Sequence, residues 1–298
     1  MSMMSQSELE RQVRHIQVQS RKAVLEVLAG EYRSCFKGMG IEFEDVREYQ
    51  HGDDVRTIDW NVTARTGRPF VKTFMEEREL SLYFMIDVSG SEDFGSGLST
   101  KREMATRIFA LLAFASAHNH DRVGLILFSD EIELHVKARK GKNHVMRMVD
   151  LIMRHEANSR GTDIGHALDY LNQVRRRRCV VFVFSDFIDE GYDDALRQAA
   201  MLHDLVCVSL RDLRERELPR TGMLEIVDAE SGAMRTIDCG DGRLRRHVRN
   251  QSLARQGRLQ DLCHEVNADL LSLCTQDDYL YELIRFFRDR SNLSVHAR

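Results

Sequence analysis

The stretch LSLYFMIDVSGS, at positions 80–91, decides the fold of this chain. It begins with a continuous apolar run that ends at Asp87, and such runs form strands that are covered on both faces. Strands of this kind belong to parallel sheets with helices on either side, so the run predicts an α/β protein. Asp87, Ser89 and Ser91 stand at alternate positions, which places three oxygen-bearing side chains at the carboxyl end of the predicted strand.

The same pattern of an apolar run closed by aspartate recurs downstream, as RVGLILFSD at 122–130, CVVFVFSD at 179–186 and LVCVSLRD at 205–212. Stretches of helical periodicity lie among these runs, at 101–120, 142–155, 164–177 and 193–203. Residues 131–137 alternate apolar and polar side chains, as an edge strand does. The alternation predicts a three-layer α/β/α fold with a doubly wound, mainly parallel sheet and one antiparallel edge strand.

The segments that flank this core have a different character. Residues 7–29 carry apolar side chains at helical spacing and predict an amphipathic helix that ends near Gly30, whereas residues 31–79 are polar and irregular. After the core, a predicted β-hairpin (223–227 with 233–238) precedes predicted helices within 244–274 and 279–288. We therefore divide the chain into a helix and irregular polar segment packed on the core (1–79), the α/β core (80–212), and a C-terminal hairpin with helices (213–298).

Composition excludes several classes of function. The chain has 298 residues, with 43 Lys and Arg against 47 Asp and Glu, and this balance argues against a dedicated nucleic-acid or anionic-membrane binder. No apolar stretch approaches the roughly 20 residues of a membrane-spanning helix. The six cysteines contain no CxxC pair, which disfavours a zinc site and a disulfide framework. We expect reduced thiols and a cytoplasmic protein.

The strand ends carry a set of oxygen ligands with the character of a metal site. Asp87, Ser89 and Ser91 follow one strand, Thr162 opens a helix after a polar loop, and Asp186 ends another strand. Two carboxylates and three hydroxyls suit a small hard cation such as Mg²⁺, and the same ligands also admit Mn²⁺ or Ca²⁺. Aspartate is also a common turn former and helix N-cap, and we favour that simpler interpretation for Asp130 and Asp212.

This DxSxS, Thr and Asp pattern in a βαβ chain resembles the von Willebrand factor A domain and its metal-ion-dependent adhesion site. The resemblance implies that Asp87, Ser89, Ser91, Thr162 and Asp186 are the metal ligands. It also implies that one coordination position is left for a carboxylate from a partner protein. A hydroxyl-rich shell leaves the cation undercompensated, so an incoming Glu or Asp gains a strong charge-assisted contact.

The resemblance extends over nearly the whole chain. GMGIEFEDVREYQHGDDVRTIDWNVTAR (38–65), VKTFMEERELSLYFMIDVSGS (71–91) and DRVGLILFSD (121–130) are similar to the bacterial domain-of-unknown-function 58 family. Glu92 stands where many members carry methionine, a departure that we expect to affect loop packing more than ligation. Family membership implies a partner, a MoxR-type AAA+ ATPase, and a role as the adaptor that recognises an unidentified client protein during its maturation, assembly or remodelling.

The alternative is an Mg²⁺-dependent phosphohydrolase that uses Asp87 at the carboxyl edge of the sheet. Haloacid-dehalogenase-like enzymes need a second Asp two residues later, and that position is Ser89 here. The chain contains no G-x-S-x-G and no G-x-x-x-x-G-K-[ST] motif, and no G-x-G-x-x-G follows a strand. A metal without an adjacent base or nucleophile is better suited to binding a ligand, so we expect no enzyme activity.

Residues 38–78 carry many charges of both signs together with one tryptophan. One interpretation is an internal network of salt bridges that fixes this segment to the α/β core. The other is a docking surface for the ATPase or the client, with Trp60 as its anchor. The residues of that surface would be Trp60, Arg47, Asp53, Asp54, Arg56 and Arg65.

Overall fold

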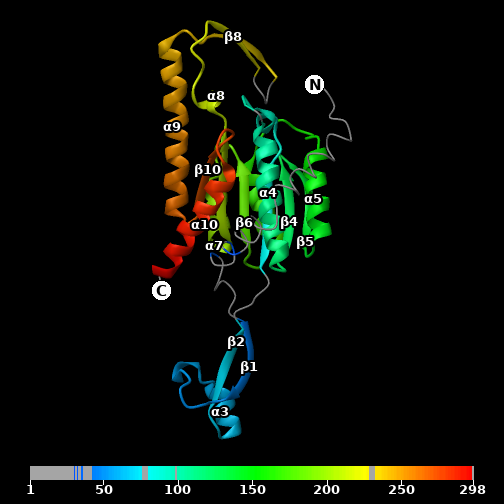
Figure 1. Cartoon of the computed structure of the whole chain (residues 1–298), viewed down its shortest axis with the longest axis vertical. Coiled ribbons are helices and arrows are strands. Elements are labelled where there is room, and N and C mark those ends of the chain that lie inside the picture. Colours follow the sequence, from blue (N-terminus) through cyan, green and yellow to red (C-terminus); the bar gives the residue numbers. More distant parts are fainter. Residues whose placement is uncertain are drawn as a thin grey trace.

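The protein is built on a six-stranded sheet (Figure 1). The computed structural model describes residues 42–75, 80–97, 99–227 and 232–296, together with Gly30, Tyr32 and Cys35. The strand order is β10-β7-β6-β3-β4-β5. The strands are β3 (Ser81–Asp87), β4 (Arg122–Phe128), β5 (Ile132–Arg139), β6 (Val180–Ser185), β7 (Asp204–Arg211) and β10 (Asp269–Cys274). Within this six-stranded sheet, only the pairing of β4 with β5 is antiparallel, which confirms the predicted edge strand.

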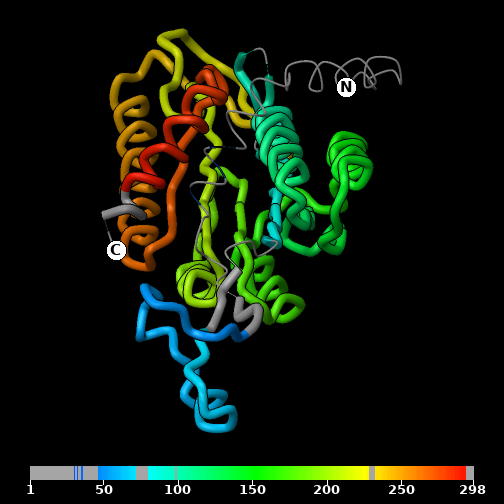
Figure 2. The backbone as a smooth tube through the Cα atoms, turned by 60° about the horizontal axis from the view of Figure 1, so that its bottom comes forward, coloured from blue at the N-terminus to red at the C-terminus, as the bar shows by residue number. Residues whose placement is uncertain are grey.

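Helices cover both faces of the sheet, as Figure 2 also shows. One face packs against α4 (Lys101–His118), α5 (Lys142–Arg154) and α10 (Tyr279–His296). The other packs against α6 (Ile164–Val174), α7 (Asp193–Leu202) and α9 (Gly242–Glu265). Because successive side chains of a strand point to opposite faces, Phe84 belongs to the first core and Met85 to the second. These layers form the three-layer α/β/α fold that the sequence predicts.

The centre of the sheet is aromatic and fully buried. Phe84 stacks on Phe182 of the neighbouring strand with ring centroids 5.2 Å apart, and it meets Phe109 of α4 edge-on at 5.0 Å. Burying side chains of this size contributes about 2–3 kcal/mol each from the hydrophobic effect. This packing fixes the position of β3, and with it the loop that follows Asp87.

The division of the chain at residue 212 is wrong in one respect. Strand β10 belongs to the C-terminal part, yet it pairs in parallel with β7 and completes the sheet. Helices α9 and α10 then cover the two faces, so these parts of 213–298 belong to the core. Residues 269–274 were expected to be helical; their sequence DLLSLC is short and apolar, and pairing with β7 determines its conformation. The hairpin is confirmed as β8 (Met223–Val227) with β9 (Met234–Asp238).

Residues 42–75 form a small ordered unit, where an irregular segment was expected. Strands β1 (Glu42–Glu48) and β2 (Phe70–Met75) pair in antiparallel fashion, and helix α3 (Trp60–Thr66) lies between them in sequence. In Figure 1 this unit stands clear of the sheet, at the end where β3 begins, so it is not packed on the core as expected. Its backbone hydrogen bonds close within the unit, for example from the N–H of Asp59 to the carbonyl of Phe70.

The helix predicted over 7–29 lies outside the described residues. Backbone at Gly30, Tyr32 and Cys35 is helical, beyond the predicted end near Gly30. Tyr32 and Cys35 are buried, and the Tyr32 ring meets Phe287 of α10 edge-on at 6.1 Å between centroids. The start of the described chain is therefore anchored on the α10 side of the sheet.

Candidate metal centre

Strand β3 carries Asp87 to the carboxyl edge of the sheet, where it is almost completely buried. Both of its carboxylate oxygens are held. Oδ1 accepts a hydrogen bond from the backbone N–H of Ser89 at 2.9 Å, and Oδ2 accepts one from the hydroxyl of Ser185 at 2.7 Å. Parallel pairing of β3 with β6 brings Ser185 to this position. Ser185 is a supporting residue whose role the sequence did not show.

The loop after β3 turns two serine hydroxyls toward each other. The Oγ atoms of Ser89 and Ser91 lie 3.2 Å apart. Ser89 is the N-cap of the short helix η2 (Gly90–Asp93), yet its hydroxyl makes no capping hydrogen bond and faces Ser91 instead. Adjacent ligands of an octahedral Mg²⁺ ion are about 3.0 Å apart, because each lies about 2.1 Å from the metal. The spacing of the two hydroxyls therefore fits two neighbouring positions around such an ion.

The loop that carries Thr162 reaches the same edge. The N–H of Gly90 donates to the carbonyl of Arg160 at 3.1 Å, and the N–H of Asp163 donates to the carbonyl of Ser129, after β4, at 3.0 Å. Thr162 lies between these two attachments and is half-buried. Its hydroxyl makes no hydrogen bond within the described ranges of the chain, so it is available to a ligand.

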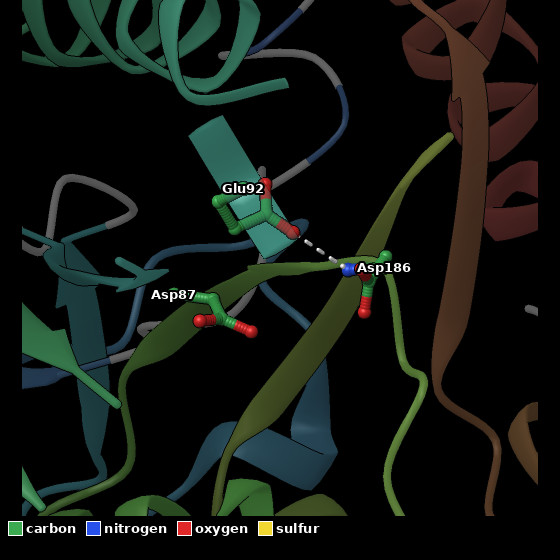
Figure 3. Close-up of side chains that lie close together, drawn as sticks. All are labelled: Asp87, Glu92 and Asp186. Carbon is green, nitrogen blue, oxygen red and sulfur yellow. Dashed lines mark hydrogen bonds between the residues drawn. The ribbon is translucent and has the colours of Figure 1, made fainter. Parts of the chain in front are cut away.

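Three buried carboxyl groups meet at this edge, as Figure 3 shows. Asp87, Glu92 and Asp186 each place a carboxylate oxygen within 4.8 Å of the other two. Glu92 lies in η2, and its Oε1 accepts a hydrogen bond from the backbone N–H of Asp186 at 3.1 Å. Glu92 is 1% exposed and belongs to the cluster, so its place is in the carboxylate group itself, whereas we expected it to affect loop packing more than ligation.

A buried lysine compensates part of this charge. The ammonium of Lys101, at the start of α4, lies 2.6 Å from Asp186 Oδ2, 2.8 Å from Glu215 Oε1 and 4.0 Å from Glu92 Oε1. Burial alone would lower the pKa of Lys101, but the surrounding carboxylates raise it, so the ammonium stays charged. Lysine is a residue type that normally lies on the surface, so the local sequence gave no sign of this pairing.

The electrostatics of the cluster favour an additional cation. Burial, and then the charge of Asp186, raise the pKa of Asp87 to about 7. Burial likewise raises the pKa of Glu92 well above its usual range. Asp87, Glu92, Asp186 and Glu215 carry more negative charge, when ionised, than Lys101 neutralises. Hard oxygen donors that repel one another in a buried site fit Mg²⁺, and a bound cation would lower these pKa values.

The predicted ligands differ in how directly each of them could contact such an ion. Asp87, Ser89 and Ser91 form a compact group after β3. Both aspartates accept a hydrogen bond at each oxygen, but the Oδ2 of Asp186 accepts from the charged ammonium of Lys101 at 2.6 Å, and its Oδ1 accepts from the N–H of Ile188 at 3.0 Å. Asp186 therefore fits a role through an intervening water or through charge better than a direct contact.

The other strand-end aspartates have the simpler roles that were expected of them. Asp212 caps the short helix α8 (Leu213–Arg216), where its side chain accepts from the N–H of Arg214 in a capping box with Glu215. Asp130 is exposed on the turn between β4 and β5. Neither belongs to the carboxylate cluster.

The predicted docking residues lie in the separate unit of residues 42–75. Arg47 and Asp53 form a bidentate ion pair at 2.7 and 2.8 Å that raises the pKa of Arg47 and lowers that of Asp53. Asp54 caps the short helix η1 (Val55–Thr57), whereas Arg56 and Arg65 are exposed. Trp60 is 68% exposed. Since this unit is joined to the start of β3, it lies at the opposite end of that strand from the candidate metal centre (Figure 1).

Strand order, the antiparallel edge strand and the oxygen cluster at the carboxyl edge together define a von Willebrand factor A-like domain. The sequence profile of the family described as "Protein of unknown function DUF58" matches residues 45–258. The chain belongs to this DUF58 family.

The chain is also similar to curated relatives and, more distantly, to solved structures. An uncharacterized protein of Mycobacterium bovis is 33% identical over 268 residues, covering 89% of this chain and 84% of the relative. An uncharacterized protein of Mycobacterium tuberculosis matches with the same identity and coverage. Among solved structures, the conserved hypothetical protein BatB from Bacteroides thetaiotaomicron is 12% identical with a TM-score of 0.47, over 72% of this chain and 99% of BatB. The VWA domain of SpRpn10 is 12% identical with a TM-score of 0.39, over 70% of this chain and 94% of that domain.

None of the helices in the described part of the chain combines the length and the apolar character that crossing a bilayer requires.

Proposed function

We propose that this protein is a non-enzymatic, metal-dependent protein-binding adaptor. Its binding site is the carboxyl edge of the sheet, where Asp87, Ser89, Ser91, Thr162 and Asp186 would hold a divalent cation. Mg²⁺ fits these hard oxygen donors best, and Mn²⁺ or Ca²⁺ would share them. When bound, the cation supplies a positive charge that attracts a carboxylate side chain of a partner protein.

The observation that carries this proposal is the way in which the oxygens are held. Ser89 and Ser91 face each other at a ligand-like spacing of 3.2 Å, next to a carboxylate that the fold orients from both sides. Because Asp87 already accepts hydrogen bonds at both oxygens, it is arranged as a fixed ligand and not as an attacking nucleophile. A carboxylate held in this way favours binding over the phosphohydrolase alternative.

We further propose a MoxR-type AAA+ ATPase as the partner, with an unidentified client protein recognised through a carboxylate at the metal. This assignment rests on family membership and on the resemblance of the motif. The exposed Trp60 and the charged residues around it offer a second surface, remote from the metal centre, so one adaptor can contact two proteins. Six free cysteines, five of them buried, support a reducing compartment such as the cytoplasm.

Titration calorimetry with Mg²⁺ tests the metal site. Asp87→Ala is expected to reduce the affinity for Mg²⁺ beyond detection, because it removes a buried carboxylate from the cluster. Asp169→Ala, which removes an exposed carboxylate on α6, is the matched control and is expected to bind like the wild type. Equal affinity in both variants would reject the site.

Two further measurements separate the adaptor from the enzyme. Capture of the organism's own MoxR-type ATPase, or of its client, is expected to weaken when EDTA removes the metal and in Asp87→Ala. Hydrolysis of p-nitrophenyl phosphate with Mg²⁺ is expected to stay at background. Turnover that disappears in Asp87→Ala and persists in Asp169→Ala would establish the phosphohydrolase instead.

A further inference from the structure

A pocket adjoins the candidate metal centre at the carboxyl edge of the sheet. It has a volume of about 40 Å³ and lies between the ends of β6 and β7, helix α8 and helix α9. Asp186 lines it, so the pocket and the carboxylate cluster share a wall. Its charged lining residues are Asp186, Arg211, Asp212, Glu215, Arg216 and Arg255.

The carboxylates in the wall of this pocket are already satisfied. Asp186 accepts from Lys101 and from the N–H of Ile188. Glu215 accepts from Lys101 at 2.8 Å and from the N–H of Asp212 at 3.1 Å. The two oxygens of Asp212 accept from the N–H and hydroxyl of Ser96, the N–H of Arg214 and the hydroxyl of Thr275. Each oxygen of these three acids already accepts at least one hydrogen bond, so none of them depends on the arginines of the pocket for a partner.

The arginine side chains of the pocket, in contrast to its acids, lack hydrogen-bond partners within the described residues. Arg211, Arg216 and Arg255 form no ion pair and donate no side-chain hydrogen bond within the described residues. Nη1 of Arg211 is buried without a partner. A buried guanidinium donor that is left unpaired is costly, so such a group generally indicates a missing acceptor.

Several arginines on the helices that cover the sheet do have acidic partners. Arg258, three residues after Arg255 on α9, pairs with Asp193 at 3.0 Å, and Arg197 pairs with Glu265 at 3.1 Å. Arg290 pairs with both Asp204 and Asp269. The pocket therefore concentrates free donors beside a buried acidic cluster, instead of neutralising that cluster with them.

We propose that this pocket binds a carboxylate of an acidic peptide segment whose neighbouring carboxylate reaches the metal centre. The inference rests on the proposed function, since it describes a second contact of the same partner. Guanidinium groups bind carboxylates through paired N–H donors, and three arginines line this pocket. The volume is far below the roughly 300–1,000 Å³ of a pocket for a drug-sized ligand or cofactor, so one small anionic group fits.

This geometry assigns specificity to the arginines. A cation alone accepts any exposed Glu or Asp, whereas a metal beside an arginine pocket selects a segment with two acidic residues close in sequence. Arg255 is exposed and Arg211 is partly buried, so the first is accessible to an approaching anion and the second can hold it inside the pocket.

Fluorescence polarisation with a labelled hexaglutamate peptide tests the proposal, with hexaglutamine as the uncharged control peptide. In the presence of Mg²⁺, Arg211→Gln and Arg255→Gln are each expected to weaken hexaglutamate binding about tenfold or more, since each removes charge-assisted contacts. Arg246→Gln is the matched control, because nine residues at about 100° each place it on the face of α9 opposite Arg255. Arg255 is exposed, so its replacement should leave the melting temperature unchanged.

The outcomes separate this pocket from the metal function. If Ser89→Ala or EDTA leaves binding unchanged while both arginine variants still reduce it, the pocket stands and the metal-dependent function fails. If binding requires Mg²⁺ but neither arginine variant changes it, the pocket is rejected and the metal function stands. A phosphorylated peptide that binds tenfold more tightly than hexaglutamate, and loses this advantage in Arg211→Gln, would overturn the assignment to carboxylate.

Discussion

The ammonium nitrogen of Lys101 lies 2.6 Å from Oδ2 of Asp186, and both side chains are almost completely buried. The same nitrogen reaches Glu215 at 2.8 Å, so one cation joins the start of α4, the end of β6 and helix α8. The acidic edge of the sheet is thus held by an internal positive charge as well as by its hydrogen bonds.

Replacing Lys101 by methionine is expected to lower the free energy of unfolding by about 3–5 kcal/mol, because it leaves buried carboxylates without their partner. Urea denaturation measures the change. Lys142→Met, at an exposed position on α5, is the control and should cost less than about 0.5 kcal/mol. A loss below about 1 kcal/mol in Lys101→Met would show that the cluster does not depend on this ion pair.

Glu92→Gln is expected to weaken Mg²⁺ binding about tenfold while the fold is kept. The amide retains an oxygen that can accept from the N–H of Asp186, but it removes one negative charge from the cluster. Calorimetric titration gives the affinity, and the far-UV circular dichroism spectrum reports the fold. Unchanged affinity would place Glu92 outside the metal's electrostatic environment. Glu131→Gln, at an exposed turn position, is a charge-matched control.

The buried His203 predicts a pH dependence of stability. Burial, and then the charges of Arg175 and Arg178, lower the pKa of His203 to about 4. In the unfolded chain its pKa is about 6.5, so the unfolded state binds the proton first as the pH falls. The contribution of His203 to stability is therefore complete above about pH 6.5 and declines from there toward pH 4, by about 1 kcal/mol between pH 7 and 5 after allowance for screening.

Urea denaturation of His203→Gln checks this expectation. Its unfolding free energy should fall less between pH 7 and 5 than that of the wild type. His247→Gln, on the exposed face of α9, should retain the full dependence. Parallel pH curves for the wild type and His203→Gln would contradict the assignment.

Gly124 is predicted to be intolerant of even a methyl group. It lies opposite Tyr83 in the sheet, and a Cβ at this position would be 2.7 Å from an edge carbon of the tyrosine ring. Gly124→Ala is expected to cost about 1–3 kcal/mol, because the ring has to shift in a packed environment. In a double-mutant cycle with Tyr83→Ala, the penalty of Gly124→Ala should largely disappear. An undiminished penalty would mean that backbone conformation, and not the ring, excludes alanine.

Much of the architecture follows from local sequence. The apolar run before Asp87 can be recognised as a buried strand because a strand covered on both faces has no polar alternation. Asp87, Ser89 and Ser91 are recognisable as a group because they are neighbours in the chain, and a loop at a strand end brings neighbours together whatever the rest of the fold does.

Residues that are distant in sequence required the tertiary structure. Glu92 and Lys101 are residue types that normally face solvent, so nothing local distinguishes them from surface charges, and only the meeting of η2, α4 and β6 buries them together. Strand β10 has a sequence that fits a helix or a strand, and pairing with β7 decides between the two. The arginine pocket likewise exists only because α8 and α9 close over the end of β7. The short-range sequence pattern determined most helices and strands and the serine loop after β3. The burial of charged side chains depends on every neighbour in space, so only the tertiary structure decided it.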